Sequence, residues 1–276
     1  MKKSDKGPEV KELQEALLHL GYALPRWGAD SDYGDETIRA VEQCFTDHGK
    51  VLSDKGSLTD SQVEWILGLV KPVEFPTGLV DLRSKHAGIH RYGKRDWKNV
   101  TGITLHQTAC NLGNTPMRWK DVGCHMGITR NGQIIYLSDF TWLVVHGHGL
   151  NTYDVGIEMD GYYEGIEGNP KTLWQPSDGP TRKPMTPTPE LVKAAQDACR
   201  YIINEVAWHG GKVKYIHAHR QASNTRQSDP GSALWKSVGL AMMKEFKLTD
   251  GGPGFVLGNG LPIPEAWDSR YVGVKY

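Results

Sequence analysis

The chain has 276 residues, of which 38% are hydrophobic and nine are tryptophans. This composition excludes large-scale disorder, and the length suits one large domain or two unequal ones. The 32 basic and 32 acidic residues give a formal net charge of zero, which argues against a protein that binds nucleic acid or an anionic membrane through bulk charge.

No apolar run approaches the ~18 residues that a membrane helix needs, so no membrane insertion is expected. The basic start of the chain is not followed by an apolar segment, so we expect no secretory signal. The four cysteines form no CxxC pair, which favours synthesis in a reducing cytoplasm.

Residues 1–72 are predicted to form a small all-α domain of three helices. Apolar residues recur at helical spacing in three segments. These residues are Val10, Leu13 and Leu17, then Ile38, Val41 and Phe45, then Val63, Ile66, Leu67 and Val70. Thr59 and Gln62 fit a capping box that opens the third helix. A Pro-containing linker is predicted over residues 73–82.

Strands alternate with helices over residues 83–247, which indicates an α/β domain. We predict strands at 102–106, 155–159 and 212–217, and a hairpin over 127–137 with a type I′ turn at Asn131-Gly132. Thr188 is predicted to cap a helix that ends before Gly210. A long irregular loop is predicted over 161–188 and an extended C-terminal tail over 248–276.

Histidines gather at the ends of the predicted strands, where a sheet positions side chains and loops give access. His219 and Asp229 are ten residues apart, which lets a ring and a carboxylate meet at one metal, and His106 could complete a three-ligand set. Two imidazoles and one carboxylate suit a zinc ion with an open fourth position. A chain with eleven histidines also offers such triples by chance. The residues alone therefore do not decide whether these three side chains form a metal site.

Several motifs together resemble the type 2 N-acetylmuramoyl-L-alanine amidases, zinc enzymes of phage endolysins and bacterial wall recycling that share a fold with peptidoglycan recognition proteins. Within residues 101–236 the matching segments are 104–109 (TLHQTA), 124–134 (CHMGITRNGQI), 142–147 (WLVVHG), 155–158 (VGIE), 218–220 (AHR) and 229–231 (DPG). Residues 7–68 resemble the three-helix peptidoglycan-binding module through 10–14 (VKELQ), 20–22 (LGY) and 33–41 (YGDETIRAV). The resemblance implies a mixed β-sheet flanked by helices, preceded by a small three-helix domain.

The resemblance implies zinc held by His106, His219 and Asp229. It also implies that Glu158 is the general base, which takes a proton from the attacking water and passes it to the leaving amine. Without the resemblance, Glu158 would be interpreted as a solvated carboxylate at a strand end.

Other polar residues near the predicted site are not expected to bind metal or take part in catalysis. Asp154 and Asp160 are expected to be solvated carboxylates. His217 is excluded as a ligand because it lies 12 residues from Asp229, where the pattern asks for 10. His86, His90, His148 and His209 are expected at the surface.

Two positions depart from better-known members. Many carry an oxyanion-holding Lys two residues before the metal-binding Asp, where this chain has Gln227, with Arg226 beside it. A charged donor binds an oxyanion about twice as strongly as a neutral one, so either Arg226 takes this role or catalysis is slower. Cys124 occupies the position of a catalytic Tyr in some phage members; it is a candidate for contact with substrate, and less readily a nucleophile.

Three further residues are candidates for binding substrate. His146 matches a cleft histidine that could hydrogen-bond the glycan or the transition state, with plain packing as the alternative. Trp174 and Tyr162, in the long loop, could stack on sugar faces or flank the stem peptide.

The predicted function is hydrolysis of the amide bond between N-acetylmuramic acid and L-alanine, by a bacteriolytic phage endolysin that acts on the wall after release from the cytoplasm. A secretion or injection route for the release stays open. The expected partner is bacterial peptidoglycan, without nucleic acid, and a monomer is expected. The alternatives are a non-catalytic peptidoglycan-binding protein and a zinc peptidase that cuts within the stem peptide.

Overall fold

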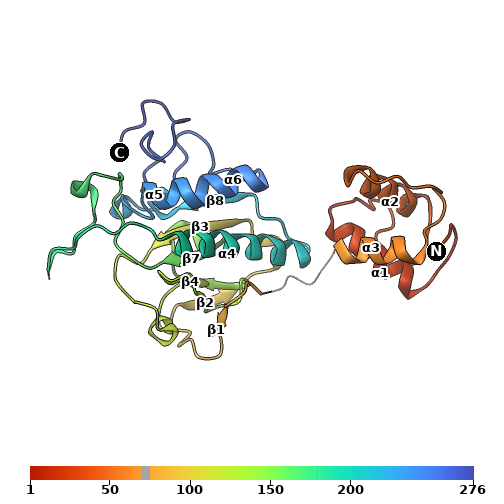
Figure 1. The fold of residues 1–276 in the computed structure, drawn as a ribbon, viewed down its shortest axis with the longest axis horizontal. Coiled ribbons are helices and arrows are strands. Elements are labelled where there is room, and N and C mark those ends of the chain that lie inside the picture. Colours follow the sequence, from red (N-terminus) through yellow and green to blue (C-terminus); the bar gives the residue numbers. More distant parts are fainter. Residues whose placement is uncertain (70–74, 179) are drawn as a thin grey trace. The chain divides into compact units, whose positions relative to one another are not determined.

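The computed structural model describes residues 1–69, 75–178 and 180–276. The chain divides into two compact units, one of Met1–Glu74 with Ala207–Gly210 and one of Phe75–Val206 with Gly211–Tyr276 (Figure 1). Val70 and the first residues of the predicted linker lie outside the described residues. None of the helices in the described ranges is long and apolar enough to cross a membrane.

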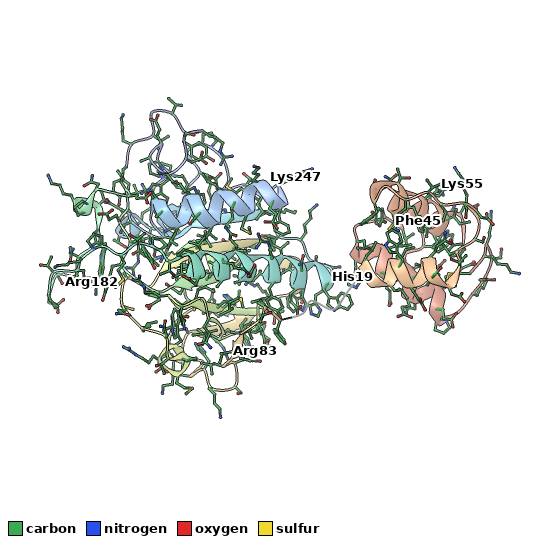
Figure 2. All side chains as sticks on the ribbon, in the orientation of Figure 1. His19, Phe45, Lys55, Arg83, Arg182 and Lys247 are labelled. Atoms are coloured by element: carbon green, nitrogen blue, oxygen red, sulfur yellow. The ribbon has the colours of Figure 1, made fainter. Side chains whose placement is uncertain are left out.

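The first unit contains the three predicted helices, α1 (Pro8–His19), α2 (Asp35–Asp47) and α3 (Asp60–Leu69). Their apolar faces meet in one core that includes Leu13, Leu17 and Phe45, of which Phe45 is labelled in Figure 2. The predicted capping box of α3 is confirmed, because Thr59 N donates to Gln62 Oε1 at 2.8 Å and Gln62 N donates to Thr59 Oγ1 at 3.3 Å.

The second unit is built on a six-stranded mixed sheet in the order β1-β5-β4-β7-β3-β8. Its strands are β1 (Val80–Asp81), β3 (Gly102–Gln107), β4 (Met126–Ile128), β5 (Ile134–Tyr136), β7 (Asp154–Met159) and β8 (Tyr215–Ala218). All neighbours run parallel except β4 and β5. β2 (Arg91–Lys94) and β6 (Trp142–Val144) form a separate antiparallel pair. The α/β fold with a mixed sheet is therefore confirmed, although β1 lies within the predicted linker.

Helices cover the sheet. The longest is α4 (Pro189–Trp208), which runs alongside the strands in Figure 1 and buries Leu191, Ala198 and Ile202. Its predicted cap is confirmed, since Leu191 N donates to Thr188 Oγ1. α5 (Ser232–Leu234), a π-helical turn at Trp235–Gly239 and α6 (Leu240–Phe246) follow in sequence. Short 3₁₀ turns occupy Trp97–Asn99, Pro116–Trp119, His148–Leu150, Pro170–Thr172, His219–Gln221 and Asn224–Arg226.

The predicted hairpin is confirmed as β4 and β5, but the predicted type I′ turn is wrong. That turn needs a positive φ at both central residues. Gly132 has φ 82°, whereas Asn131 is not among the residues with positive φ. Thr129 N donates to Gln133 O, so this backbone pair extends the hairpin beyond the two strands and encloses a loop of three residues, 130–132. A three-residue loop with Gly at the left-handed position is the alternative geometry for such hairpins.

Residues 248–276 contain no helix or strand but are not a free tail. Trp267 is fully buried, and its Nε1 donates to Gly165 O. Backbone N–H groups of Leu257 and Leu261 donate to the carbonyls of Gln221 and Arg220. Aromatic and aliphatic residues spaced irregularly along this segment fill the unit's core, which hydrophobic periodicity does not reveal.

Candidate metal centre and cleft

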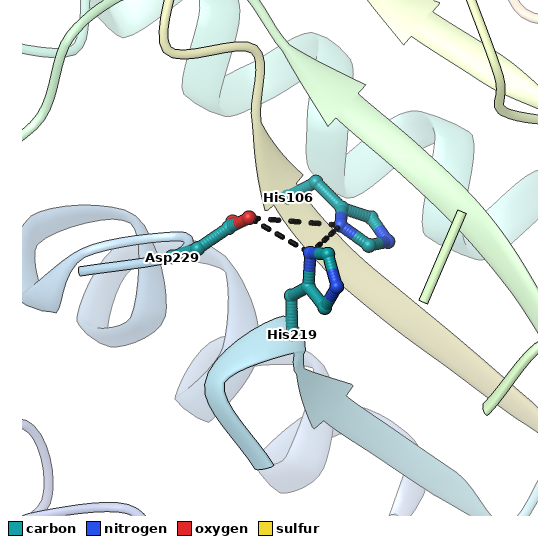
Figure 3. A group of neighbouring side chains, drawn as sticks. All are labelled: His106, His219 and Asp229. Carbon is teal, nitrogen blue, oxygen red and sulfur yellow. Dashed lines mark hydrogen bonds and ion pairs between the residues drawn. The ribbon is translucent and has the colours of Figure 1, made fainter. Parts of the chain in front are cut away.

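Three side chains from distant parts of the sequence meet at one edge of the sheet (Figure 3). His106 lies near the end of β3, and His219 follows the last residue of the neighbouring β8. Asp229 comes from the loop before α5, and its Oδ1 accepts a hydrogen bond from Gln107 N at 2.8 Å. Two strand ends and one braced loop therefore fix the three groups.

The facing atoms are close enough to share one ion. His219 Nδ1 lies 2.9 Å from His106 Nδ1 and 2.9 Å from Asp229 Oδ2, and His106 Nδ1 lies 3.8 Å from Asp229 Oδ2. Tetrahedral zinc with bonds of roughly 2.0–2.1 Å places its ligand atoms about 3.3 Å apart. The observed spacings lie on either side of this value, so the residues fit a small divalent ion bound by two imidazoles and a carboxylate.

The charge states also suit metal binding. Burial, followed by the charge of His219, lowers the pKa of His106 to about 4. Burial acts to raise the pKa of Asp229, but its contacts with His106 and His219 hold that pKa well below the usual range. A neutral imidazole and an ionised carboxylate are the forms that ligate metals.

Glu158 stands beside this set. In β7 it pairs with His106 in the parallel register, and its Oε1 lies 4.0 Å from His106 Nδ1. Glu158 Oε2 is buried and has no hydrogen-bond partner. Burial and then the charge of Asp229 raise the pKa of Glu158 well above its ordinary value, against the opposing effect of Arg226. A carboxylate with one free oxygen and a raised pKa is suited to accept and release a proton.

A cleft of about 400 Å³ opens over these groups, and His219, Asp229 and Glu158 line it. Of the two predicted oxyanion donors, Arg226 lines this cleft. Gln227 instead lines an adjacent hollow of about 330 Å³. The structure therefore brings Arg226, and not Gln227, into the cleft.

The predicted aromatic residues flank one arginine. The guanidinium of Arg182 (labelled in Figure 2) lies 4.8 Å from the ring centre of Tyr162 and 4.7 Å from that of Trp174. Arg182 also donates to Ala109 O, just after β3. Trp174 lines both the cleft and the adjacent hollow, whereas Tyr162 lines neither. Arg182 therefore holds Tyr162 and Trp174 of the loop together. Trp174 also lines the cleft, where a ligand can contact it.

His146 lines the cleft, but both of its ring nitrogens already have partners. Its Nδ1 lies 3.1 Å from His106 Nε2, and its Nε2 lies 3.3 Å from Asp154 O. The predicted hydrogen bond to substrate would have to break one of these contacts. The structure therefore places His146 as a support for His106.

Cys124 does not reach the cleft, which corrects its prediction as a substrate contact. It is fully buried in a cluster that includes Trp119, Ile135 and Leu137. Burial raises the pKa of its thiol well above the ordinary value, so the thiolate that a nucleophile needs is disfavoured.

The predictions of solvated carboxylates are also wrong. Asp154 is buried, and its Oδ2 accepts from Thr104 Oγ1 and lies 2.7 Å from His217 Nδ1. Asp160 is buried and accepts from Leu112 N and other loop groups. His217 lies outside the metal set, as predicted.

Three supporting residues were not predicted from the sequence. Gln107 braces the Asp229 loop, because its Nε2 donates to the carbonyls of Ser228 and Pro230; its place beside His106 was the only signal. His148, predicted as a plain surface residue, contacts His219. Arg182 carried no signal in the sequence. His86, also predicted at the surface, is buried and bonds to Val122 O.

Part of this chain is similar in sequence to known proteins. Residues 96–232 match the family model described as N-acetylmuramoyl-L-alanine amidase. A curated relative from Bacillus licheniformis, named "Probable N-acetylmuramoyl-L-alanine amidase", is 51% identical over 41 residues, which are 15% of this chain and 12% of that protein. The match thus spans a small part of that relative's length.

Solved structures are similar at low identity. The N-acetylmuramoyl-L-alanine amidase LysC from Clostridium intestinale URNW is 17% identical, with a TM-score of 0.43, over 63% of this chain and 99% of that chain. Drosophila PGRP-LB is 16% identical, with a TM-score of 0.43, over 63% and 97%. The match to the family model covers both metal-facing histidines, Glu158 and Asp229. Residues 96–232 therefore form a domain of the N-acetylmuramoyl-L-alanine amidase family.

Proposed function

We propose that this protein is a zinc-dependent peptidoglycan hydrolase that cleaves the amide bond between N-acetylmuramic acid and L-alanine. One observation carries the proposal: His106, His219 and Asp229 converge beside Glu158 at an open cleft. A non-catalytic binding protein has no need for a complete ligand set next to a carboxylate with an unpaired oxygen. This favours catalysis over recognition alone.

His106, His219 and Asp229 would hold the zinc ion, which when bound polarises the scissile carbonyl and makes water a stronger nucleophile. Glu158 takes the proton of the attacking water through its free oxygen and passes it to the leaving L-alanine amine. Arg226, at the wall of the cleft, stabilises the negative charge that develops on the carbonyl oxygen. Trp174 supplies an apolar face on which a sugar or a stem peptide can lie.

Digestion of purified sacculi tests this proposal. The protein should release peptides that begin with a free L-alanine amine and create no new reducing sugar ends. Mass spectrometry of the fragments distinguishes the alternatives, because a peptidase would leave L-alanine attached to the glycan. EDTA should abolish the release and zinc should restore it. A protein that binds sacculi without releasing fragments under any metal condition would instead be a recognition protein.

We further propose that the three-helix unit binds the polymer. It contains the resemblance to the peptidoglycan-binding module, and its helices enclose a core of their own. Residues 1–69 expressed alone should therefore sediment with sacculi. Removing these residues should reduce hydrolysis of sacculi while leaving hydrolysis of small soluble fragments unchanged. Equal loss on both substrates would contradict a role in anchoring.

The biological setting that we propose is a phage endolysin. Co-expression of the chain with a pore-forming holin should lyse the host, while either protein alone should not. Lysis that requires a secretion machine in place of a holin would indicate a secreted effector.

A further inference from the structure

We propose that His148 is a positioning residue, which holds the imidazole of His219 in the orientation and tautomer needed to bind the metal. This inference rests on the proposed metal site. His148 Nδ1 lies 3.0 Å from His219 Nε2, and His148 lines the cleft beside the ligand set. The contact is made by the ring nitrogen of His219 that faces away from the other two ligands.

The geometry defines which nitrogen donates. His219 Nδ1 faces both His106 Nδ1 and Asp229 Oδ2 at 2.9 Å, so Nδ1 is the atom available for the ion. A neutral imidazole that ligates through Nδ1 carries its proton on Nε2. His219 Nε2–H therefore donates to His148 Nδ1. Partners of this kind fix the ring of a metal ligand and make it a better electron donor.

The backbone at His148 is unusual in a way that serves this contact. His148 has φ 52°, in the left-handed region that non-glycine residues adopt at an energetic cost. It follows Gly147, whose N–H donates to Asn151 Oδ1 at 2.6 Å, and begins the turn His148–Leu150. The turn directs the His148 side chain to His219, and a strained conformation at a cleft is typical of functional positions.

The two metal-facing histidines are supported unequally. His106 Nε2 meets His146, which is itself buried and bonded to Asp154 O. Within the part of the chain that the structure describes, the partner of His219 Nε2 is the exposed His148 alone. The second support therefore depends on one side chain that substitution can remove without opening the core.

Two substitutions separate the side chain from the backbone. In His148→Asn the side-chain Oδ1 takes the position of Nδ1 along the chain, accepts a hydrogen bond, and tolerates the left-handed conformation. In His148→Gly the acceptor is lost and the backbone strain is relieved. We expect the zinc Kd, measured by competition with a chromogenic chelator, to rise about 10- to 100-fold in His148→Gly. The Kd of His148→Asn should stay within about threefold of the wild type, on the scale of the same outer-shell effects.

Two controls accompany the measurement. His90→Gly removes another cleft histidine, which bonds to Asp121 O and not to a ligand, and should leave the zinc Kd unchanged. The Tm of metal-free His148→Gly should equal or exceed that of the wild type, which excludes misfolding as the cause of weak binding.

Failure of the inference and of the proposed function are distinguishable. If the wild type binds zinc and His148→Gly binds it equally well, the positioning role is wrong while the metal site stands. If His148→Asn binds zinc as weakly as His148→Gly, the imidazole acts otherwise than as an acceptor, and the inference also fails. If the wild type binds no zinc, the metal site itself is refuted.

Discussion

His106 and Glu158 lie directly opposite each other on the parallel strands β3 and β7, with His106 Nδ1 4.0 Å from Glu158 Oε1. The strands are joined by their backbone hydrogen-bond ladder, so a proposed metal ligand and the proposed base are held at a separation set by the sheet. A site on rigid strands keeps its geometry better than one on loops. Changes to either side chain should therefore alter the chemistry before they alter the fold.

Glu158→Gln should separate catalysis from metal binding. The amide keeps the shape of the carboxylate but cannot take the proton, so turnover on wall fragments should fall about 10²- to 10⁴-fold. Zinc content, measured by atomic absorption, should not change because Glu158 is not one of the three ligands. The exposed Glu190→Gln, in the first turn of α4, is the matched control and should keep full activity. Loss of zinc together with turnover would assign Glu158 to the ligand set.

Arg226 and Gln227 can be ranked as oxyanion donors by replacing each with alanine. Arg226 lines the cleft and Gln227 does not. Arg226→Ala should therefore lower kcat about 10²- to 10³-fold, the usual effect of losing such a donor. Gln227→Ala should change kcat less than about threefold, because its side chain faces the adjacent hollow. Steady-state kinetics on a soluble muramyl peptide measure both, and the opposite ranking would return the role to Gln227.

Arg182 should control substrate binding through Trp174. Its guanidinium lies between the Tyr162 and Trp174 rings, and each exposed contact of this type contributes about 0.5–1 kcal/mol. Arg182→Ala should free Trp174 and raise KM severalfold with kcat nearly unchanged. Arg182→Lys should behave similarly, since an ammonium cannot stack on two rings as a planar guanidinium does. A fall in kcat at constant KM would place Arg182 in the chemistry instead.

Local patterns in the sequence predicted much of the fold. Thr59 and Thr188 could be predicted as capping residues because each accepts a hydrogen bond from a residue three positions further along the chain. Such caps depend on short-range chemistry, which a sequence displays directly. The residue pattern alone did not decide whether His106, His219 and Asp229 form a metal site, and only the family resemblance singled out this set; the structure places the three side chains together.

The burial and the hydrogen-bond partners of individual side chains could not be predicted in this way. Asp154 and Asp160 are buried because their hydrogen-bond donors come from residues about 50 positions distant. Trp267 enters the core from a segment without periodicity. His148 and His219 are 71 positions apart, and only the folded chain brings them together. Burial and partners at such separations follow from tertiary packing, which residue patterns do not encode locally.

His125 should make the larger unit sensitive to acid. Its Nδ1 accepts from Gly156 N at 3.0 Å, and its Nε2 lies 3.0 Å from Trp142 O, so the neutral ring satisfies both partners. A proton on Nδ1 would break the bond to Gly156. Burial, and then the charge of Arg95, lower the pKa of His125 to about 3.

The sign of the effect follows from the unfolded chain, which takes up this proton near the ordinary pKa of about 6.5. Stability from neutral His125 is complete above that pH and is lost as the pH falls, by about 1.4 kcal/mol per unit, or about 2 kcal/mol at pH 5. Urea unfolding at pH 7.5 and pH 5 measures the loss, and NMR should show no titration of the ring above pH 5. In His125→Asn the side-chain Oδ1 still accepts from Gly156 N but cannot be protonated in this range, so the difference between the two pH values should shrink by about 2 kcal/mol. An unchanged difference would mean that other buried histidines, and not His125, cause the acid sensitivity.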